Sequence, residues 1–425
     1  MVSEEPNYGS GARAVQRTKK TQPRYIRITD FGDDGIEPGH DYVTADPIEP
    51  ECILHADDLL FARSGATVGK TYIHEDTSES AIFAGYCIRF RFKHDVVLPR
   101  FVYWCTKTDF YARWVTKIQR PAGQPNINKE EFKSFEIPLP DILKVQSNIV
   151  AVMDAARMTR RAKLAEAESL LTGLDGFLLD TLGLTQPPKD NCKFFAVRVS
   201  DLGKRIDAYS NQLRFRNLFA YIHRSSYRVA SFKELASRIF SGVTPLAKGD
   251  SYVLPPDGVR FIRSGEITAD GAVTPNSEVH ISASIHNGLM KHSQLESGDL
   301  LIAIVGATIG AAGVFNRDEP ANINQAIAAV RLAGNEVSTE YACLYLRSSV
   351  GQALLDFFKR PVARANINLE EIGEIPLIIP PKPVQEAIVY ESHRRLDEAR
   401  RLRVEAETDW QKAKRWFEEQ LLGGI

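Results

Sequence analysis

The sequence lacks an excess of charge of either sign. Its 425 residues contain 53 Lys and Arg against 54 Asp and Glu, a formal net charge of -1. A protein that binds nucleic acid through a broad basic surface shows a surplus of Lys and Arg. Any contact with a polyanion is therefore expected to come from a local patch.

Cysteines and long apolar runs are also scarce. The five cysteines lie far apart, without the short spacings of structural zinc sites or disulfide frameworks: Cys52, Cys87, Cys105, Cys192 and Cys343. No stretch approaches the ~18 apolar residues of a membrane helix, and the first twenty residues hold no apolar core of the kind a signal peptide needs. A cytoplasmic protein without membrane contact is expected.

Motifs for catalysis are missing as well. The segment SGATVGKT at 64–71 resembles a phosphate-binding loop, but Ser64 stands where that motif requires Gly. A tight turn that requires glycine is the favoured interpretation. The sequence has no adenine-methylation signature, no nuclease cluster of carboxylates and lysine, and no histidine spacing typical of a catalytic or metal site. We therefore expect no catalytic residue and no metal ligand in this chain.

What the sequence does have is a long internal repeat of about 240 residues. Four blocks recur in the same order. YIRITDFGDDG from Tyr25 matches FIRSGEITADG from Phe261, and DLLFARSGATVG from Asp58 matches DLLIAIVGATIG from Asp299. QRPAGQPNINKEEF from Gln119 matches KRPVARANINLEEI from Lys359, and VQSNIV from Val145 matches VQEAIV from Val384. The period is that of a whole domain with a connector, which indicates a tandem duplication.

Each copy has the pattern of a mixed α/β globule. Residues 80–92 and 300–314 are rich in β-branched and aromatic side chains and predict strands, and residues 99–117 and 338–359 are compatible with helices. Extended Ile/Pro-rich exits, FEIPLP and IPLIIPP, follow. The second copy is preceded by long segments from Ser200 and Ser226, whereas the first has only NYGSGARAV. The first copy is therefore expected to lack an opening strand.

About 40 residues almost free of Gly and Pro follow each exit, which predicts two helices of ~60 Å each. Apolar residues recur along both at three- and four-residue spacings: Ala167, Leu171, Leu174, Leu178 and Leu182 in the first, and Ala399, Ala406, Trp410, Ala413, Phe417 and Leu421 in the second. One seam on each helix predicts that the two pack together, antiparallel if the duplication is a pseudo-twofold. The alternative is that they belong to a larger helical core.

Duplex DNA has twofold axes perpendicular to its length, and proteins of matching symmetry read two half-sites. The paired GATVG and GATIG blocks, the NIN blocks with their exits, and the helices after VQ resemble the specificity (S) subunit of type I restriction-modification systems, over roughly residues 8 to 422. The resemblance implies two target recognition domains on a conserved antiparallel helical spacer. It also implies two modification (M) subunits that use S-adenosylmethionine, and restriction (R) subunits that use ATP and Mg.

Basic and amide residues beside the repeated blocks are the candidates for DNA contacts, because Arg and Gln can read base edges while Lys neutralises phosphate. They are Lys19, Lys20, Arg24, Arg63, Lys70, Lys117, Arg120 and Gln124 in the first copy, and Arg263, Lys291, Lys359, Arg360 and Arg364 in the second. Each could equally be a solvated surface charge. Arg120 and Arg360 stand out because both copies keep a basic residue beside Pro. Asn126 and Asn366 are expected to cap the helices that follow.

The sequence thus predicts an α+β protein: two mixed α/β target recognition domains, joined by two long antiparallel spacer helices in a pseudo-twofold repeat. The expected domains are 1–140, apparently short at its N-terminus, a helix at 141–184, a second domain at 185–380 and a helix at 381–425. The predicted function is non-enzymatic reading of a bipartite, asymmetric site in double-stranded DNA, with no cofactor in this subunit. Two alternatives remain open: an assembly adaptor that reads only one half-site, and an unrecognised fused methyltransferase/endonuclease.

Overall fold

The computed structural model describes residues 1–32, 35–36, 43–75, 77–119, 125–184, 194–198, 206–246, 250–268, 270–274, 279–359 and 365–423. The chain divides into two units. Unit 1 comprises residues 1–167 and 400–425, and unit 2 comprises residues 168–399. None of the described helices is both long enough and apolar enough to cross a membrane.

The core of unit 1 is a four-stranded sheet in the order β1-β10-β7-β8. Its strands are β1 (Asn7–Tyr8), β10 (Cys87–Phe90), β7 (Leu59–Ala62) and β8 (Thr71–Ile73). All residues of β7, β8 and β10 are buried, as expected for strands covered on both faces. Smaller pairs flank this sheet: β3 (Arg24–Ile26) with β9 (Ala81–Phe83), β2 (Arg13–Gln16) with β6 (Val43–Asp46), and β4 (Phe31–Gly32) with β5 (Gly35–Ile36).

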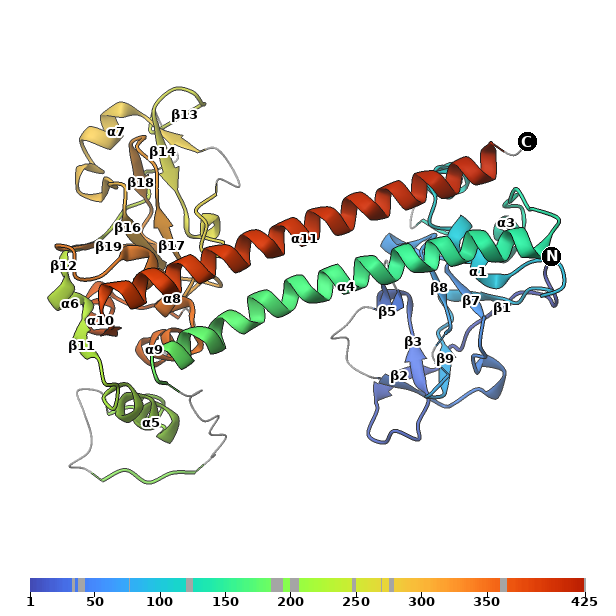
Figure 1. Cartoon of the computed structure of the whole chain (residues 1–425), viewed down its shortest axis with the longest axis horizontal. Helices are drawn as coiled ribbons and strands as arrows, with labels where there is room; N and C mark the ends of the chain where they lie inside the picture. Colours follow the sequence, from blue (N-terminus) through green and yellow to red (C-terminus); the bar gives the residue numbers. More distant parts are fainter. Residues whose placement is uncertain are drawn as a thin grey trace. The chain divides into compact units, whose positions relative to one another are not determined.

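Unit 2 repeats the sheet of unit 1, strand for strand. Its order is β12-β19-β16-β17. The strands are β12 (Ala236–Ser241), β19 (Ile327–Leu332), β16 (Asp299–Ala303) and β17 (Ala312–Phe315). The parallel pair recurs as β14 (Val259–Ile262) with β18 (Ala321–Ile323), and β15 (His280–Ile281) joins β14 to β13 (Tyr252–Val253). The predicted internal repeat of two mixed α/β globules is therefore confirmed (Figure 1).

Each run predicted as helical forms two helices instead of one. Unit 1 has α1 (Pro99–Cys105) and α2 (Asp109–Ile118), and unit 2 has α8 (Thr339–Arg347) and α9 (Ser349–Phe358). The break has the same cause in both. The hydroxyl of Thr108 accepts a hydrogen bond from the backbone N–H of Tyr111, and that of Ser348 accepts one from Gly351, so each residue caps a new helix.

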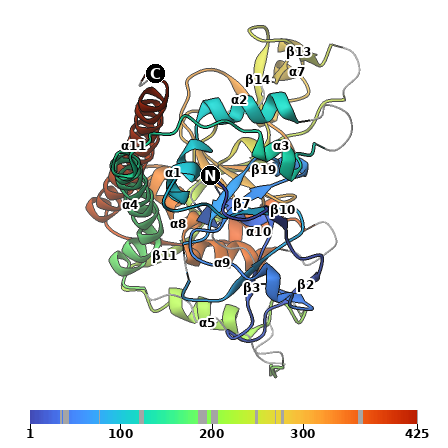
Figure 2. The same ribbon diagram turned by 90° about the vertical axis from the view of Figure 1, so that its right-hand side faces the viewer.

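The two long helices are present as α4 (Leu143–Thr181) and α11 (Lys382–Leu422) (Figure 1, green and red). Within unit 1, Lys163 of α4 forms ion pairs of 3.1 and 2.9 Å with Glu405 and Asp409 of α11. Within unit 2, Arg395 of α11 lies over the ring of Phe177. In each unit, later residues of α4 thus meet earlier residues of α11, so the two helices run antiparallel there. Figure 2, a view along the helices, shows α4 and α11 next to each other.

The predicted seams are inward-facing, and they also enter the globular cores. Ala167 of α4 and Leu182, which directly follows α4, are fully buried, as is Phe417 of α11. Phe417 belongs to the core of unit 1, where its ring lies 5.9 Å from that of Phe101, and Leu182 belongs to the core of unit 2. Both sequence interpretations of these helices therefore hold in part: they pair with each other, and each also completes a globule.

A buried glutamine fixes the start of each long helix. The side chain of Gln146 accepts a hydrogen bond from the N–H of Leu98 and donates to the carbonyls of Val96 and Pro140. Gln385 forms the same three bonds, with the N–H of Ser338 and the carbonyls of Glu336 and Pro380. The VQ block of the repeat thus ties each helix to the loop before α1 or α8.

The copies differ where the sequence predicts. In unit 2, β11 (Arg228–Ser231) pairs with β20 (Pro376–Ile379). The segment before β12 also contains α5 (Leu213–Ile222) and α6 (Phe232–Leu235). In unit 1, the residues that match β20, 136–140, form no strand and are half-buried or exposed. The described residues ahead of β1 contain no counterpart of β11.

Candidate nucleic-acid interface

The GATVG and GATIG blocks form the same tight turn in the two units. Each joins two antiparallel strands, β7 to β8 and β16 to β17. Gly65 and Gly69 have φ of 76° and 83°, and Gly306 and Gly310 have 88° and 91°, a conformation that favours glycine. A strand follows this turn, whereas a helix follows a phosphate-binding loop. The glycine-turn interpretation of the sequence is therefore the one that fits.

The turn packs on the helix beside it. A Cβ added at Gly69 would lie 2.7 Å from Cγ1 of Val115 in α2, and one at Gly310 would lie 2.8 Å from Oε1 of Gln352 in α9. Tyr111 also donates its hydroxyl hydrogen to the carbonyl of Gly69 at 2.9 Å. The position of the turn is thus set by the α2 and α9 helices.

The NIN segments meet these turns. The N–H of Ile127 donates to the carbonyl of Arg63 at 2.8 Å, and the N–H of Ile367 donates to that of Ile304 at 3.0 Å. Gly65 also donates to the carbonyl of Pro125 at 3.1 Å. Residues 120–124 and 360–364 precede these contacts, and four candidates among them lie outside the described residues: Arg120, Gln124, Arg360 and Arg364.

The helix caps differ from the prediction by two residues. Asn128 and Asn368, the second asparagines of the NIN blocks, cap α3 (Lys129–Lys133) and α10 (Leu369–Glu374). Each forms a capping box with the glutamate three residues on. Asn126 and Asn366 instead form backbone bridges to Ser64 and Val305. The prediction that the first asparagine caps was wrong, because that residue is held by the turn.

Three described candidates of unit 1 surround the turn. Arg63 directly follows β7, and its guanidinium carbon lies 4.6 Å from the ring centroid of Tyr8. Lys70 is exposed immediately after the turn, and Lys117 is exposed in the last turn of α2. In unit 2, the half-buried Lys359 occupies the matching end of α9.

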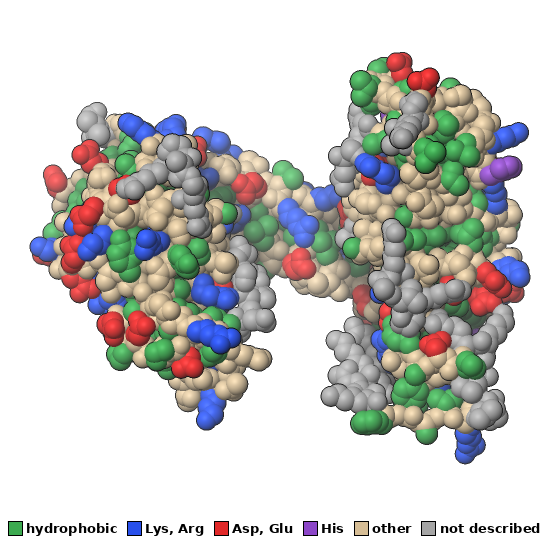
Figure 3. Space-filling model, turned by 180° about the vertical axis from the view of Figure 1, so that it is seen from behind, with side chains coloured by type: hydrophobic (Ala, Val, Ile, Leu, Met, Phe, Trp, Pro, Cys, Tyr) green, Lys and Arg blue, Asp and Glu red, His purple; other side chains and the backbone are tan. Residues whose placement is uncertain are grey.

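The other candidates lie on different elements. Lys19 and Lys20 are exposed in a turn ahead of β3, where Arg24 lines a cavity of about 250 Å³ with His74, Glu79 and Arg157. Arg263 is exposed after β14, and Lys291 is exposed in a short helical turn at 291–293. On the face drawn in Figure 3, basic and acidic side chains are interspersed in both units, in keeping with the balanced net charge.

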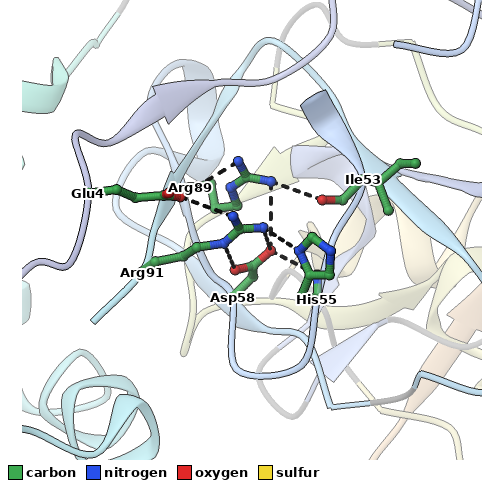
Figure 4. Close-up of polar contacts among 6 residues, drawn as sticks. All are labelled: Glu4, Ile53, His55, Asp58, Arg89 and Arg91. Atoms are coloured by element: carbon green, nitrogen blue, oxygen red, sulfur yellow. Dashed lines mark hydrogen bonds and ion pairs between the residues drawn. The ribbon is translucent and has the colours of Figure 1, made fainter. Parts of the chain in front are cut away.

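Sequence reasoning missed an ion pair between a buried aspartate and an arginine that supports the sheet in each unit. Figure 4 shows the pair of unit 1. The carboxylate of Asp58 accepts hydrogen bonds from Nε and Nη2 of Arg91 at 2.6 and 3.0 Å and from the N–H of His55 at 2.9 Å. Asp299 accepts the same set from Arg331 and the N–H of Glu296. The hydrogen bond to Asp58 raises the pKa of Arg91. The aspartate that opens each DLL block was the available signal.

The described cysteines and acidic residues form no evident reactive centre. Cys52, Cys87, Cys105 and Cys343 are free and buried, and burial raises the pKa of each thiol, to about 11 for Cys52 and Cys343. Within the described part of the chain, no group of three or more His, Cys, Asp or Glu side chains could hold a metal ion.

A known protein family matches both copies of the repeat. The family model described as "Type I restriction modification DNA specificity domain" matches residues 20–167 and 255–390, one match in each copy of the repeat. The chain belongs to this family. It is a DNA specificity subunit of a type I restriction-modification system.

Three solved structures are similar to this specificity subunit, and the first has the same fold. A chain from a study of complex assembly and conformational transition of the type I R-M system is 15% identical, with full coverage of both chains and a TM-score of 0.58. The HsdS subunit from Thermoanaerobacter tengcongensis is 16% identical over 99% of this chain and 96% of its own, with a TM-score of 0.41. The S subunit from M. genitalium is 12% identical over 96% and 92%, with a TM-score of 0.48. No curated protein matches this specificity subunit.

Proposed function

We propose that each globule of this specificity subunit reads one half of a bipartite, asymmetric site in double-stranded DNA, and that residues 120–124 and 360–364 contribute to the two readings. The observation that carries the proposal is the repeated junction of glycine turn and NIN segment, which both copies build beside a basic segment. Arg beside these junctions suits bidentate contacts to guanine, and Lys70 and Lys117 suit phosphate.

The chemistry is proposed to come from partner subunits. In this proposal two modification subunits carry S-adenosylmethionine, restriction subunits use ATP and Mg, and the complex works in the cytoplasm. The specificity subunit itself would have no catalytic residue and no cofactor. The long helices would dock the modification subunits and set the unread spacer length. Exposed apolar residues support a docking role: Val145, Val152 and Met158 on α4, and Tyr390 on α11.

The test is methylation of a randomised DNA library by the chain co-purified with its candidate modification subunit. A bipartite methylated motif that disappears without this chain would support the proposal. Arg360→Ala should relax or abolish the reading of one half-site only, and Arg120→Ala that of the other. Equal loss at both halves for either variant would contradict the assignment of one globule to each half. Lys93→Ala is the matched control, because Lys93 is exposed beyond the opposite end of β10.

A single short motif would instead favour an adaptor that reads only one half-site. Methylation by the isolated chain with S-adenosylmethionine would contradict the non-catalytic role. No described contact favours either alternative.

A further inference from the structure

We infer that four side chains at the turn-bearing end of the two sheets are specificity-determining: Arg63 and Tyr86 in unit 1, and Gln325 with Thr244 in unit 2. The inference rests on the proposed function, in which each globule reads one half-site. It extends that function to residues that the structure describes.

Arg63 and Tyr86 have backbone equivalents in unit 2, Ile304 and Ala326, and Ala326 directly follows Gln325. In unit 1, the N–H of Arg63 donates to the carbonyl of Tyr86 at 2.9 Å, just ahead of β10. In unit 2, the N–H of Ile304 donates to the carbonyl of Ala326 at 2.8 Å, just ahead of β19. Both bonds involve the residue two positions before the GATVG or GATIG block, next to the bridges with Asn126 or Asn366. The surface therefore adjoins the repeated junction in each globule.

The framework at this end is repeated, while its exposed side chains are not. Gly9 and Gly242 are a repeated pair: a Cβ at Gly9 would overlap the carbonyl oxygen of Phe83, and one at Gly242 would overlap that of the equivalent Ile323. By contrast, Arg63 corresponds to Ile304 in the strand register. A subunit that reads two different half-sites with one scaffold needs this combination of a constant frame and changed surface groups.

The side chains of unit 1 are held for contact with a partner. Tyr86 is 62% exposed, although the backbone around it is fixed by the bond from Arg63. The Arg63 guanidinium stacks on Tyr8, and no acidic side chain in the described residues forms an ion pair with it. Stacking limits the motion of the guanidinium, so less conformational entropy is lost when it binds a guanine edge through two hydrogen bonds. Tyr86 adds an aromatic face for a thymine methyl group or an unstacked base.

Unit 2 offers a different chemistry one residue away, because Gln325 directly precedes Ala326, the equivalent of Tyr86. Gln325 and Thr244 are exposed, and the Thr244 hydroxyl donates a hydrogen bond to Oε1 of Gln325. Among the described groups, none accepts a hydrogen bond from Nε2 of Gln325. The amide nitrogen can therefore donate to a purine N7 or a guanine O6. Thr244 acts as a positioning residue, since its bond orients the amide that would meet the base.

The experiment uses the complex of the full chain with its modification subunit and compares methylated motifs from a randomised library. Arg63→Ala and Tyr86→Ala should each relax bases of one half-site, and Gln325→Ala should relax bases of the other, by about 5- to 100-fold in discrimination at the affected position. Thr244→Val should mimic Gln325→Ala, whereas Thr244→Ser, which keeps the hydroxyl, should retain the wild-type motif.

Lys93→Ala and Asn335→Ala serve as controls, because both residues are exposed beyond the opposite ends of β10 and β19. They should leave the motif unchanged, and all variants should co-purify with the modification subunit at the wild-type ratio. If Arg120→Ala and Arg360→Ala relax their half-sites while the four variants here do not, this inference is overturned and the proposed function stands. If the wild-type complex yields no bipartite motif, both fail.

Discussion

Asp58 and Asp299 are equivalent residues, and both are almost fully buried. The guanidinium group of an arginine donates two hydrogen bonds to each carboxylate, an arrangement called the arginine fork below. Replacing the charged acceptor leaves that arginine with a weakened partner, which costs about 2–3 kcal/mol for a hydrogen-bonded charged pair. Asp58→Asn should therefore lower the free energy of unfolding by this amount. Asp299→Asn should have a similar effect, since its contacts are the same. Urea unfolding followed by tryptophan fluorescence would measure the loss for Asp58.

The neighbouring Asp57 provides a matched control. It has a φ of 66°, which asparagine also tolerates, and its side chain forms no ion pair with a described residue. Asp57→Asn should leave the stability within about 0.5 kcal/mol of the wild type. Equal losses for the two variants would show that the arginine fork contributes nothing specific.

Glu266 should make the free energy of unfolding depend on pH, in a direction that its environment determines. It is 3% exposed and lies 3.6 Å from the Arg260 guanidinium. Burial raises its pKa above the ordinary 4.5, although the nearby Arg260 and Arg263 partly oppose this shift. The folded protein therefore holds this proton more tightly than the unfolded chain does. The resulting stabilisation is complete below pH 4.5 and is lost as the pH rises through the folded-state pKa.

Glu266→Gln removes this titration. The difference in free energy of unfolding, wild type minus variant, should therefore fall as the pH rises from about 4.5 to neutral. Urea titrations at several pH values would measure it. A difference that stays constant with pH, or rises, would mean that burial does not govern this carboxyl group.

At the residue scale, the sequence predicted the local structure around the candidate interface better than its details. Repetition correctly indicated that both copies share a glycine turn and an NIN segment. It did not distinguish Asn126 from Asn128, because both precede acidic residues and only the backbone bridge to Ser64 decides which one caps. Nor did it identify Tyr86 or Gln325, since these positions are joined to the turn by strand pairing that no local pattern encodes.

At the element scale, the end of α11 is a structural part of unit 1. Phe417 is fully buried and packs on Phe101 of α1. Phe417→Ala should lower the free energy of unfolding by about 3–5 kcal/mol, through lost burial and the cavity that remains. Leu422→Ala, at a position that is 50% exposed, should cost far less. Thermal unfolding followed by the signal of Trp104 and Trp410 would compare the two. Similar midpoints would indicate that unit 1 folds without this helix end.

The long helices were predictable because their composition and seam spacing are local properties of the sequence. The split between α1 and α2 was not, because Thr108 is compatible with a continuous helix and ends one only through its cap. The difference between the copies ahead of their sheets was predictable, because the described residues 1–6 before β1 are far fewer than the residues before β12. Its structural consequence was not predictable: the segment 136–140 forms no strand because strand formation needs a partner.

For the whole molecule, the duplication was the strongest signal, since four ordered blocks at one period leave few alternatives. The limits of the packing units were not predictable. Their boundaries fall inside both long helices, at Ala167 and Ala399, because each helix end is buried in a different core. The spacing of apolar residues predicts a helix, but it does not predict in which hydrophobic core each end of that helix is buried.

The unit boundaries at Ala167 and Ala399 are sites for testing whether the long helices set the length of unread DNA between the two half-sites. Inserting three heptads after both Ala167 and Ala399 keeps the seam in phase and lengthens each helix by ~32 Å, close to the ~34 Å of one turn of duplex DNA. The methylated motif should keep both half-sites and gain a spacer of about one turn. A single heptad adds only ~10 Å, about a third of a turn, so the second half-site would face away and methylation should drop sharply. An unchanged spacer in the three-heptad variant would show that the helices do not set it.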